Sequence, residues 1–292
     1  MNHLIPLSWI YWDPPKEAFT IPGINLSVAW YGILFAVGFL LAYWMIIPIF
    51  RQFILEHHSK LSRPAATAMA TQAADTLMLY AVIGTVIGAR LGHMLFYDFS
   101  LFIHHPLEFF MIRHGGLASH GGTVGVMIAI IFFLKRIQKK SLPELTYIDL
   151  LDIMVIPTAI VACCIRLGNF INQEILGTAT SLPWGIIFGH PGDASTPIPR
   201  HPAQLYEALL YAATFAILFT LWYKAKDSLK KGTLSGLFFI FVFGGRFLIE
   251  FVKEPQGGIF DESFLQVGQY LSIPFILLGI YLLCLQPKKT LR

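Results

Sequence analysis

The sequence predicts an all-α integral membrane protein with seven transmembrane helices. The 292-residue chain is 55% hydrophobic and 13% charged, and its mean hydropathy of +0.63 is typical of membrane proteins. Seven apolar stretches are each about twenty residues long, which is the length that a helix needs to cross a bilayer. The basic residues gather in every second connection between these stretches, as expected for loops on one side of a membrane.

The seven predicted spans follow one another along the whole chain, and the connections between them are short. They cover residues 27–48, 74–97, 119–136, 149–167, 203–223, 233–252 and 264–286. The longest connection, residues 168–202, is too short for a separate soluble domain and is predicted to be a small irregular segment. Residues 1–292 are therefore expected to form a single transmembrane domain.

The distribution of basic residues predicts the orientation of the chain. One set of connections contains Arg51, Lys60 and Arg63; Lys135, Arg136, Lys139 and Lys140; Lys224, Lys226, Lys230 and Lys231; and Lys288, Lys289 and Arg292. The opposite set contains only Lys16, Arg113, Arg200 and Lys253. The positive-inside rule assigns the first set to the cytoplasm, so the N-terminus is expected outside and the C-terminus inside. This arrangement requires an odd number of spans, and the seven predicted spans meet this requirement.

Most ionisable side chains within the spans fall in their outer halves. This group comprises Arg90, His93, His120, Arg166, Glu207, Arg246 and Glu250, whereas Asp75, Asp149 and Asp152 lie toward the inner ends. Charges inside a membrane are costly and usually mark a functional cavity. The pattern therefore predicts a polar site, built from several helices, that opens toward the outer leaflet.

The most unusual stretch runs from Arg166 to Gly177 and reads Arg-Leu-Gly-Asn-Phe-Ile-Asn-Gln-Glu-Ile-Leu-Gly. Its amides and its carboxylate need polar partners that lipid does not supply. It is either a helix end with a snorkelling arginine and a polar loop, or the lining of a polar cavity. Arg166 and Arg246 both end outward-running spans, so their guanidinium groups could meet at a shared phosphate. The alternative for each arginine is a separate contact with lipid headgroups.

Four further side chains have roles that the sequence leaves open. Glu250 lies four residues after Arg246, so the two could pair, either as structural support or to orient the arginine. Glu207 shares a helix face with Gln204, but an acid near a helix start also complements the helix dipole. Arg90 could counter a carboxylate such as Glu250. Tyr31 could belong to the site or to the interfacial aromatic belt.

His120 is a candidate general base, because histidine titrates near neutral pH. It lies between Ser119 and the pair Gly121–Gly122. These glycines would let a lipid or another chain approach closely, or they would permit tight helix packing. Packing accounts for the glycines but not for the histidine.

Several classes of protein are not indicated. The sequence contains no nucleotide-binding loop, no paired His-Glu zinc motif and no serine hydrolase elbow. Its three cysteines all lie in apolar runs and form neither a disulfide framework nor a metal-ligand pattern. No metal, no cofactor and no nucleic acid partner is expected.

The sequence resembles bacterial prolipoprotein diacylglyceryl transferases along nearly its whole length. The matching segments, in order, are Trp30-Tyr31-Gly32, Leu95-Phe96-Tyr97, His120-Gly121-Gly122, Arg166 to Glu174 with Gly177, Arg200 to Glu207, and Arg246 to Phe251. The segment that starts at Arg166 resembles the family signature. Two departures are Gly-Ala-Arg at 88–90, where Gly-Gly-Arg is more usual, and a shorter stretch at 178–199.

The resemblance implies that the protein transfers diacylglycerol from phosphatidylglycerol to the lipobox cysteine of a prolipoprotein signal peptide. The products would be a thioether and glycerol phosphate, made at the periplasmic face of the bacterial inner membrane. It also implies important positions at Tyr31, His120, Arg166, Asn169, Glu174, Gly177, Arg246 and Glu250, with Glu207 in a further family motif. No cofactor or metal is implied.

Two other classes fit part of the pattern. A phospholipid scramblase or lipid-binding transporter would also place arginines near headgroups, but it predicts a polar track through both leaflets. A purely structural membrane scaffold leaves the stretch from Arg166 to Gly177 unexplained.

Overall fold

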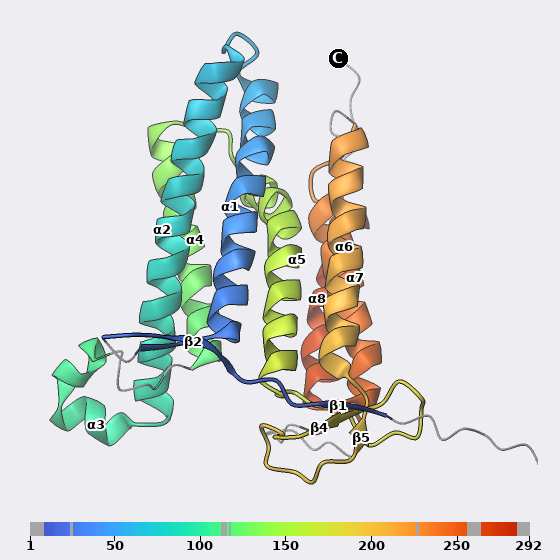
Figure 1. Ribbon diagram of the computed structural model, residues 1–292. Coiled ribbons are helices and arrows are strands. Elements are labelled where there is room, and N and C mark those ends of the chain that lie inside the picture. Colours follow the sequence, from blue (N-terminus) through green and yellow to red (C-terminus); the bar gives the residue numbers. More distant parts are fainter. Residues whose placement is uncertain are drawn as a thin grey trace, which may run out of the picture. The chain divides into compact units, whose positions relative to one another are not determined.

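The computed structural model describes residues 9–23, 26–111, 116, 118–225, 228–255 and 264–284 (Figure 1). Within these residues seven helices are long and apolar enough to cross a membrane, which confirms the predicted fold class. They are α1 (Trp30–His57), α2 (Arg63–Phe96), α4 (Ser119–Lys140), α5 (Tyr147–Ile171), α6 (Ala203–Ala225), α7 (Thr233–Ile249) and α8 (Val267–Cys284). The shorter helical elements are α3 (Phe99–His104), η1 (Pro106–Phe110) and η3 (Glu250–Val252).

Several helices extend beyond the predicted spans, because a hydropathy pattern detects only the apolar part of a helix. The clearest case is α2, which begins at Arg63 although the predicted span begins at 74. Ser62 caps this helix by accepting a hydrogen bond from the Ala65 backbone, and a proline follows in the first turn. Residues 285–286 of the last predicted span lie outside the described residues, as do Arg113, Lys226, Lys288, Lys289 and Arg292.

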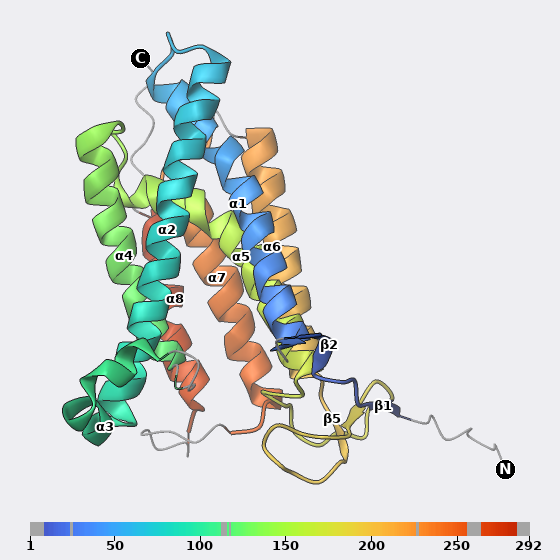
Figure 2. The same ribbon diagram turned by 60° about the vertical axis from the view of Figure 1, so that its left-hand side comes forward.

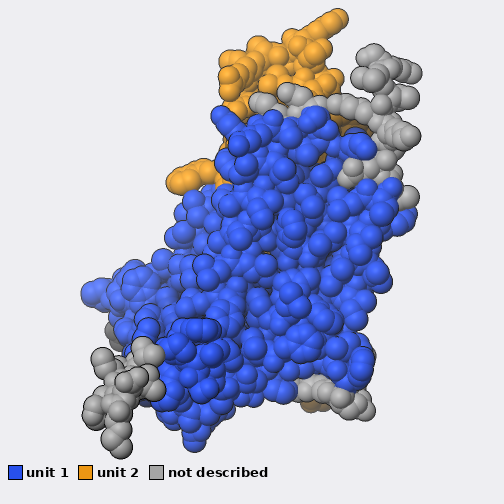
Figure 3. All heavy atoms as spheres, turned by 90° about the vertical axis from the view of Figure 1, so that its right-hand side faces the viewer, with its two compact units in different colours: residues 1–42, 151–292 blue, residues 43–150 orange. Residues whose placement is uncertain are grey.

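The chain divides into two compact units (Figure 3). The first unit comprises Met1–Ala42 and Leu151–Arg292, and the second comprises Tyr43–Leu150. Helices α1 and α5 each contribute residues to both units.

In the second unit, glycines allow α2 and α4 to pack closely, and the two helices lie side by side in both ribbon views (Figures 1 and 2). A Cβ atom on Gly125 would lie 2.7 Å from the Gly88 Cα atom, and one on Gly121 would lie 2.7 Å from the Gly92 Cα atom. Only glycine leaves room for these backbones to touch. Gly121 and Gly125 therefore serve helix packing, whereas a Cβ atom on Gly122 would make only ordinary contacts, the nearest at 3.4 Å from the Ala89 Cβ atom.

Asp75, Asp149 and Asp152, which the sequence analysis predicted to lie toward the inner ends of the spans, have structural partners. In the first unit, the Asp152 carboxylate accepts hydrogen bonds from the backbone of Gly232 at 2.6 Å and of Ser235 at 2.8 Å, so it caps the start of α7. In the second unit, Asp75 of α2 accepts from the Tyr43 hydroxyl of α1 at 2.7 Å, and Asp149 accepts from the backbone of Thr146, the residue before α5. Asp75 and Asp152 therefore join neighbouring helices, and Asp149 caps the start of its own helix.

Short strands, which the sequence did not predict, lie at one end of the helices of the first unit (Figure 1). A three-stranded sheet has the order β1 (Ile10–Trp12), β4 (Ile186–Phe188) and β5 (Pro199–Arg200), with β1 parallel and β5 antiparallel to β4. A hairpin of β2 (Glu17–Ile21) and β3 (Leu26–Ala29) leads into α1. Strands of two to five residues are too short to show a clear alternation of apolar and polar side chains.

The sheet is attached to the last turn of α5. The Trp12 indole stacks on Phe170 at a centroid distance of 4.6 Å and donates a hydrogen bond to the Phe170 carbonyl. Asp13 contacts the His190 ring at 2.6 Å and accepts from the Gln173 side chain at 3.0 Å. The hydrogen bond with His190 holds the pKa of the Asp13 carboxyl below its usual range. These contacts fix the polar stretch that begins at Arg166.

Candidate functional site

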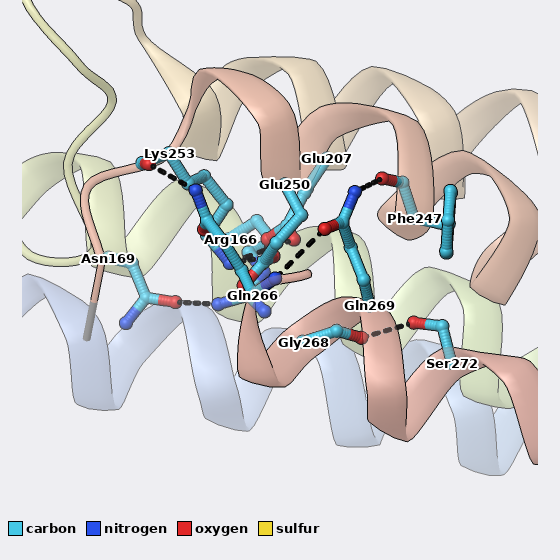
Figure 4. Close-up of polar contacts among 10 residues, drawn as sticks. All are labelled: Arg166, Asn169, Glu207, Phe247, Glu250, Lys253, Gln266, Gly268, Gln269 and Ser272. Atoms are coloured by element: carbon cyan, nitrogen blue, oxygen red, sulfur yellow. Dashed lines mark hydrogen bonds and ion pairs between the residues drawn. The ribbon is translucent and has the colours of Figure 1, made fainter. Parts of the chain in front are cut away.

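Arg166 lies in the last two turns of α5, which continues to Ile171. Its Nε atom forms an ion pair with the Glu207 carboxylate of α6, and its Nη1 atom donates to Asn169 at 3.0 Å (Figure 4). The Arg166 side chain is only 12% exposed and the Glu207 side chain is fully buried. The guanidinium group is therefore held inside the protein by partners from its own chain.

Asn169 links Arg166 to a second acid. It accepts from the guanidinium group and donates to the Glu174 carboxylate at 3.1 Å, while Asn172 donates to the other oxygen of Glu174. The Gln204 side chain donates to the Glu174 backbone carbonyl. The amides of the polar stretch thus supply the partners that its carboxylate needs.

Lys253 completes a buried ion cluster that sequence reasoning missed. Its Nζ atom lies 3.0 Å from the Glu250 carboxylate and 3.6 Å from that of Glu207, and the side chain is only 3% exposed (Figure 4). The sequence placed Lys253 among ordinary loop residues of the outer face. The one available signal was its spacing of three residues from Glu250.

Arg246 of α7 lies near the same region, with Tyr211 of α6, Glu207 and Glu250 as its titratable neighbours. Tyr211 is only 3% exposed, and Arg166 is among its charged neighbours. The sequence analysis did not single out this tyrosine.

Two glycines bring separate segments against this cluster. A Cβ atom on Gly168 would lie 2.7 Å from the Tyr31 ring, so the ring packs on α5 within one turn of Arg166. A Cβ atom on Gly177 would lie 2.6 Å from the His201 Cβ atom and 2.8 Å from the Val252 carbonyl oxygen. Gly177 is therefore needed for packing where the start of α6 and the end of η3 meet.

The first turn of α8 supports Glu250. A Cβ atom on Gly268 would lie 2.7 Å from a Glu250 carboxylate oxygen, so the helix backbone passes directly beside this acid (Figure 4). Gln269 is 1% exposed and donates to the Phe247 carbonyl at 3.2 Å, which ties α8 to α7 just before Glu250. The Gln266 side chain donates to the Lys253 carbonyl at 3.5 Å.

His120 belongs to the second unit and is exposed. Its ring lies 6.0 Å from that of Phe96 and 5.9 Å from that of Tyr97, measured between centroids. It lines one end of an apolar groove of about 1050 Å³ between α2 and α4. Glycine and aliphatic or aromatic side chains form the rest of the lining.

Arg90, also in the second unit, holds the chain that precedes α4. Its buried guanidinium group donates to the backbone carbonyls of Glu108, Phe109, Met111 and Gly116. The sequence suggested a carboxylate such as Glu250 as its partner, whereas the hydrogen bonds described for Arg90 go to backbone carbonyls of its own unit. Arg90 thus joins α2 to the backbone of residues 108–111 and of Gly116.

The chain is similar to one family of known proteins. A family model described as prolipoprotein diacylglyceryl transferase matches residues 16–285. Three similar proteins are named phosphatidylglycerol–prolipoprotein diacylglyceryl transferase. The one from Protochlamydia amoebophila is 39% identical over 94% of both chains, and that from Chlamydia pneumoniae is 38% identical over 97% of both. The one from Tolumonas auensis is 43% identical over 91% of this chain and 94% of its own length.

The buried position of Lys253 predicts that its charge is needed for folding. Lys253→Met keeps a long side chain but leaves Glu207 and Glu250 with one cation fewer. Breaking a buried ion pair in this way costs about 3–5 kcal/mol. We expect a clear fall in the thermal unfolding temperature of the detergent-solubilised protein.

Lys224→Met is the matched control for this substitution, because Lys224 is exposed near the end of α6. It should leave the unfolding temperature almost unchanged. Equal unfolding temperatures for Lys253→Met and the unmodified protein would contradict a structural need for the buried ammonium group.

Proposed function

The chain belongs to the prolipoprotein diacylglyceryl transferase family, and from this we propose that it transfers the diacylglyceryl group of phosphatidylglycerol to a prolipoprotein cysteine. The observation that best supports the proposal is the pair of largely buried cations Arg166 and Lys253, which share the carboxylate of Glu207 at the ends of membrane helices, with Arg246 of α7 close to the same acid. A cationic cluster of this kind suits an anionic phosphodiester that enters from a bilayer.

The proposed reaction is a displacement at a glyceryl carbon. The cysteine sulfur forms a C–S bond to this carbon while the bond from the carbon to the phosphate oxygen breaks. The electron pair of the broken bond leaves with glycerol phosphate, and the thiol proton passes to a base. The negative charge that develops on the leaving phosphate is stabilised by the fixed guanidinium groups.

We assign the site residues of the first unit the following roles in this scheme. Arg166 and Arg246 hold the phosphate of the donor lipid, and Tyr31 and Asn169 line the same site. The carboxylates of Glu207 and Glu250 orient the cations, and Glu174 fixes Asn169. Gly177 contributes through packing, since it allows the segments that carry Glu207 and Glu250 to meet.

We assign the acceptor, the membrane and the orientation in the same way. The acceptor is the lipobox cysteine of a prolipoprotein signal peptide, and the membrane is the bacterial cytoplasmic membrane. The excess of Lys and Arg in alternate connections supports an N-terminus outside, a C-terminus in the cytoplasm and a site near the periplasmic face.

A reporter enzyme fused after Arg292 tests this orientation. A phosphatase that is active only in the periplasm should show no activity there, because the positive-inside rule places this end in the cytoplasm. Its full activity at this position would contradict the assigned orientation, and therefore the periplasmic site.

The phosphate-binding role predicts that lysine cannot replace either arginine. Arg166→Lys and Arg246→Lys keep the charge but remove the two-pronged donor. Loss of one charged hydrogen bond lowers a rate about 10- to 100-fold. The assay combines purified protein, phosphatidylglycerol vesicles and a lipobox peptide, and measures the release of glycerol phosphate.

Arg136→Lys is the control, because Arg136 is exposed near the end of α4. It should retain full turnover. Unchanged turnover in both Arg166→Lys and Arg246→Lys would remove the phosphate-binding role, and no release by the unmodified protein would remove the proposed function itself.

We propose that His120 accepts the proton of the acceptor thiol. Its ring is exposed and lines an apolar groove, so a substrate can reach it, which supports this role. His120→Gln keeps a polar side chain but removes the base, which typically costs about two to four orders of magnitude in rate.

The pH dependence of His120→Gln separates this role from others. A higher pH raises the thiolate fraction and should partly restore turnover, while binding of phosphatidylglycerol vesicles stays unchanged. If His120→Gln instead fails to bind these vesicles, His120 is a donor ligand. Near-normal turnover would assign proton removal to another group.

A further inference from the structure

Gln173 is a buried residue whose backbone has a conformation that favours glycine. Its φ is +56°, and the residue is only 1% exposed. Glycine adopts a positive φ without a steric cost, whereas a residue with a Cβ atom does not. The tight turn after α5 would therefore form more easily with glycine at this position. The turn alone does not account for a glutamine here.

The Gln173 carboxamide is held at both of its ends by segments outside the helices. Its Nε2 atom donates to the Asp13 carboxylate at 3.0 Å, and its Oε1 atom accepts from the His190 backbone at 2.7 Å. The same Asp13 oxygen contacts the His190 ring at 2.6 Å. Because each of these three residues contacts the other two, the buried carboxamide has one defined orientation.

The sheet fixes the two anchors of this carboxamide relative to each other. Trp12 pairs with Phe188 in the parallel ladder of β1 and β4, and the Trp12 carbonyl accepts from the Gly189 backbone at 3.0 Å. A Cβ atom on Gly189 would lie 2.6 Å from the Asp13 carboxyl carbon, so glycine there leaves room for the Asp13 side chain. The strands therefore set Asp13 next to His190.

The turn that contains Gln173 also carries an acid of the site. Glu174 follows Gln173 directly, and its carboxylate accepts from Asn169 and from Asn172, each at 3.1 Å. Asn169 in turn accepts from the Arg166 guanidinium group at 3.0 Å. The backbone of Gln173 therefore determines where the Glu174 carboxylate lies, and this carboxylate orients the amide of Asn169.

We infer that Gln173 is a positioning residue, which aims the Glu174 carboxylate at the amide that holds Arg166. This inference rests on the proposed function, in which Arg166 binds the phosphate of the donor lipid. The effect passes from the anchored carboxamide through the backbone of the turn to Glu174. It therefore depends on the Gln173 side chain and not on how easily the turn forms.

Gln173→Gly and Gln173→Ala together test the inference, because they separate the side chain from the backbone strain. Both remove the carboxamide, so Glu174 loses its fixed direction and kcat should fall about tenfold in each variant. Glycine relaxes the positive φ and alanine does not, so the thermal unfolding temperature should be higher in Gln173→Gly than in Gln173→Ala. KM for phosphatidylglycerol should change less than about threefold in both, since Arg166 and Arg246 remain.

Asp13→Ala tests the anchor, with Glu17→Ala as the matched control. Alanine cannot accept a hydrogen bond from the Gln173 side chain, so kcat of Asp13→Ala should also fall about tenfold. Glu17 is an exposed acid on β2 of the same N-terminal segment, and Glu17→Ala should keep wild-type kcat. In the Gln173→Gly background the additional loss from Asp13→Ala should be less than about threefold, because the contact is already absent.

A second double variant tests whether Gln173 acts through Glu174. Glu174→Ala removes the carboxylate that the turn aims at Asn169. The additional loss of kcat from Gln173→Gly in this background should therefore be less than about threefold. Losses that simply multiply would show that the two side chains act independently and would overturn the inference.

The remaining outcomes separate the inference from the proposed function. No release of glycerol phosphate by the unmodified protein overturns the proposed function. An active unmodified protein with wild-type kcat in both Gln173 variants overturns the role of Gln173 alone. A kcat that follows the unfolding temperature, close to wild type in Gln173→Gly and low in Gln173→Ala, assigns the residue to the turn itself and also overturns that role.

Discussion

The ion pair between Arg166 and Glu207 is the contact on which the rest of the site depends. A guanidinium group inside a membrane helix is costly unless an acid compensates it, and a fully buried acid needs a cation in the same way. Lys253 contacts the second oxygen of Glu207 and also Glu250. Because these ions neutralise one another, α5, α6 and η3 must come together for any of them to be buried.

Asn169 controls how many acids neutralise Arg166. It accepts a hydrogen bond from the guanidinium group and passes one on to Glu174, so this carboxylate is held without a direct ion pair. A neutral amide therefore stands between Arg166 and Glu174, so this acid does not neutralise the guanidinium group by direct contact. Asp75 and Asp152 are engaged in structural bonds, such as that of Asp152 to α7, so these acids do not indicate the polar track that a scramblase requires.

The sequence predicted the features that depend on single residues in an apolar background. An arginine or a glutamate in a membrane span is conspicuous, so Arg166, Glu207 and Arg246 were all recognised from the sequence. Lys253 was not, because a lysine in a loop looks solvated until the fold buries it. Tyr211 was not, because tyrosines are common in membrane helices and its burial depends on how the helices pack. The short strands escaped because their pairing joins residues far apart in the chain, such as Ile10 and Ile186.

The turn after α5 shows how the fold fixes the site before any ligand binds. Gln173 and Ile175 both have φ of +56°, a conformation that is unfavourable for residues other than glycine and uncommon for a β-branched one. The Gln173 side chain donates to Asp13 and accepts from the His190 backbone, so the residues that follow β1 and β4 hold the turn in place. Glu174, between the two strained residues, is thereby aimed at Asn169 and through it at Arg166. The residues next to the sheet thus keep a strained turn in place. This turn orients the Glu174 carboxylate, which acts on Arg166 through Asn169.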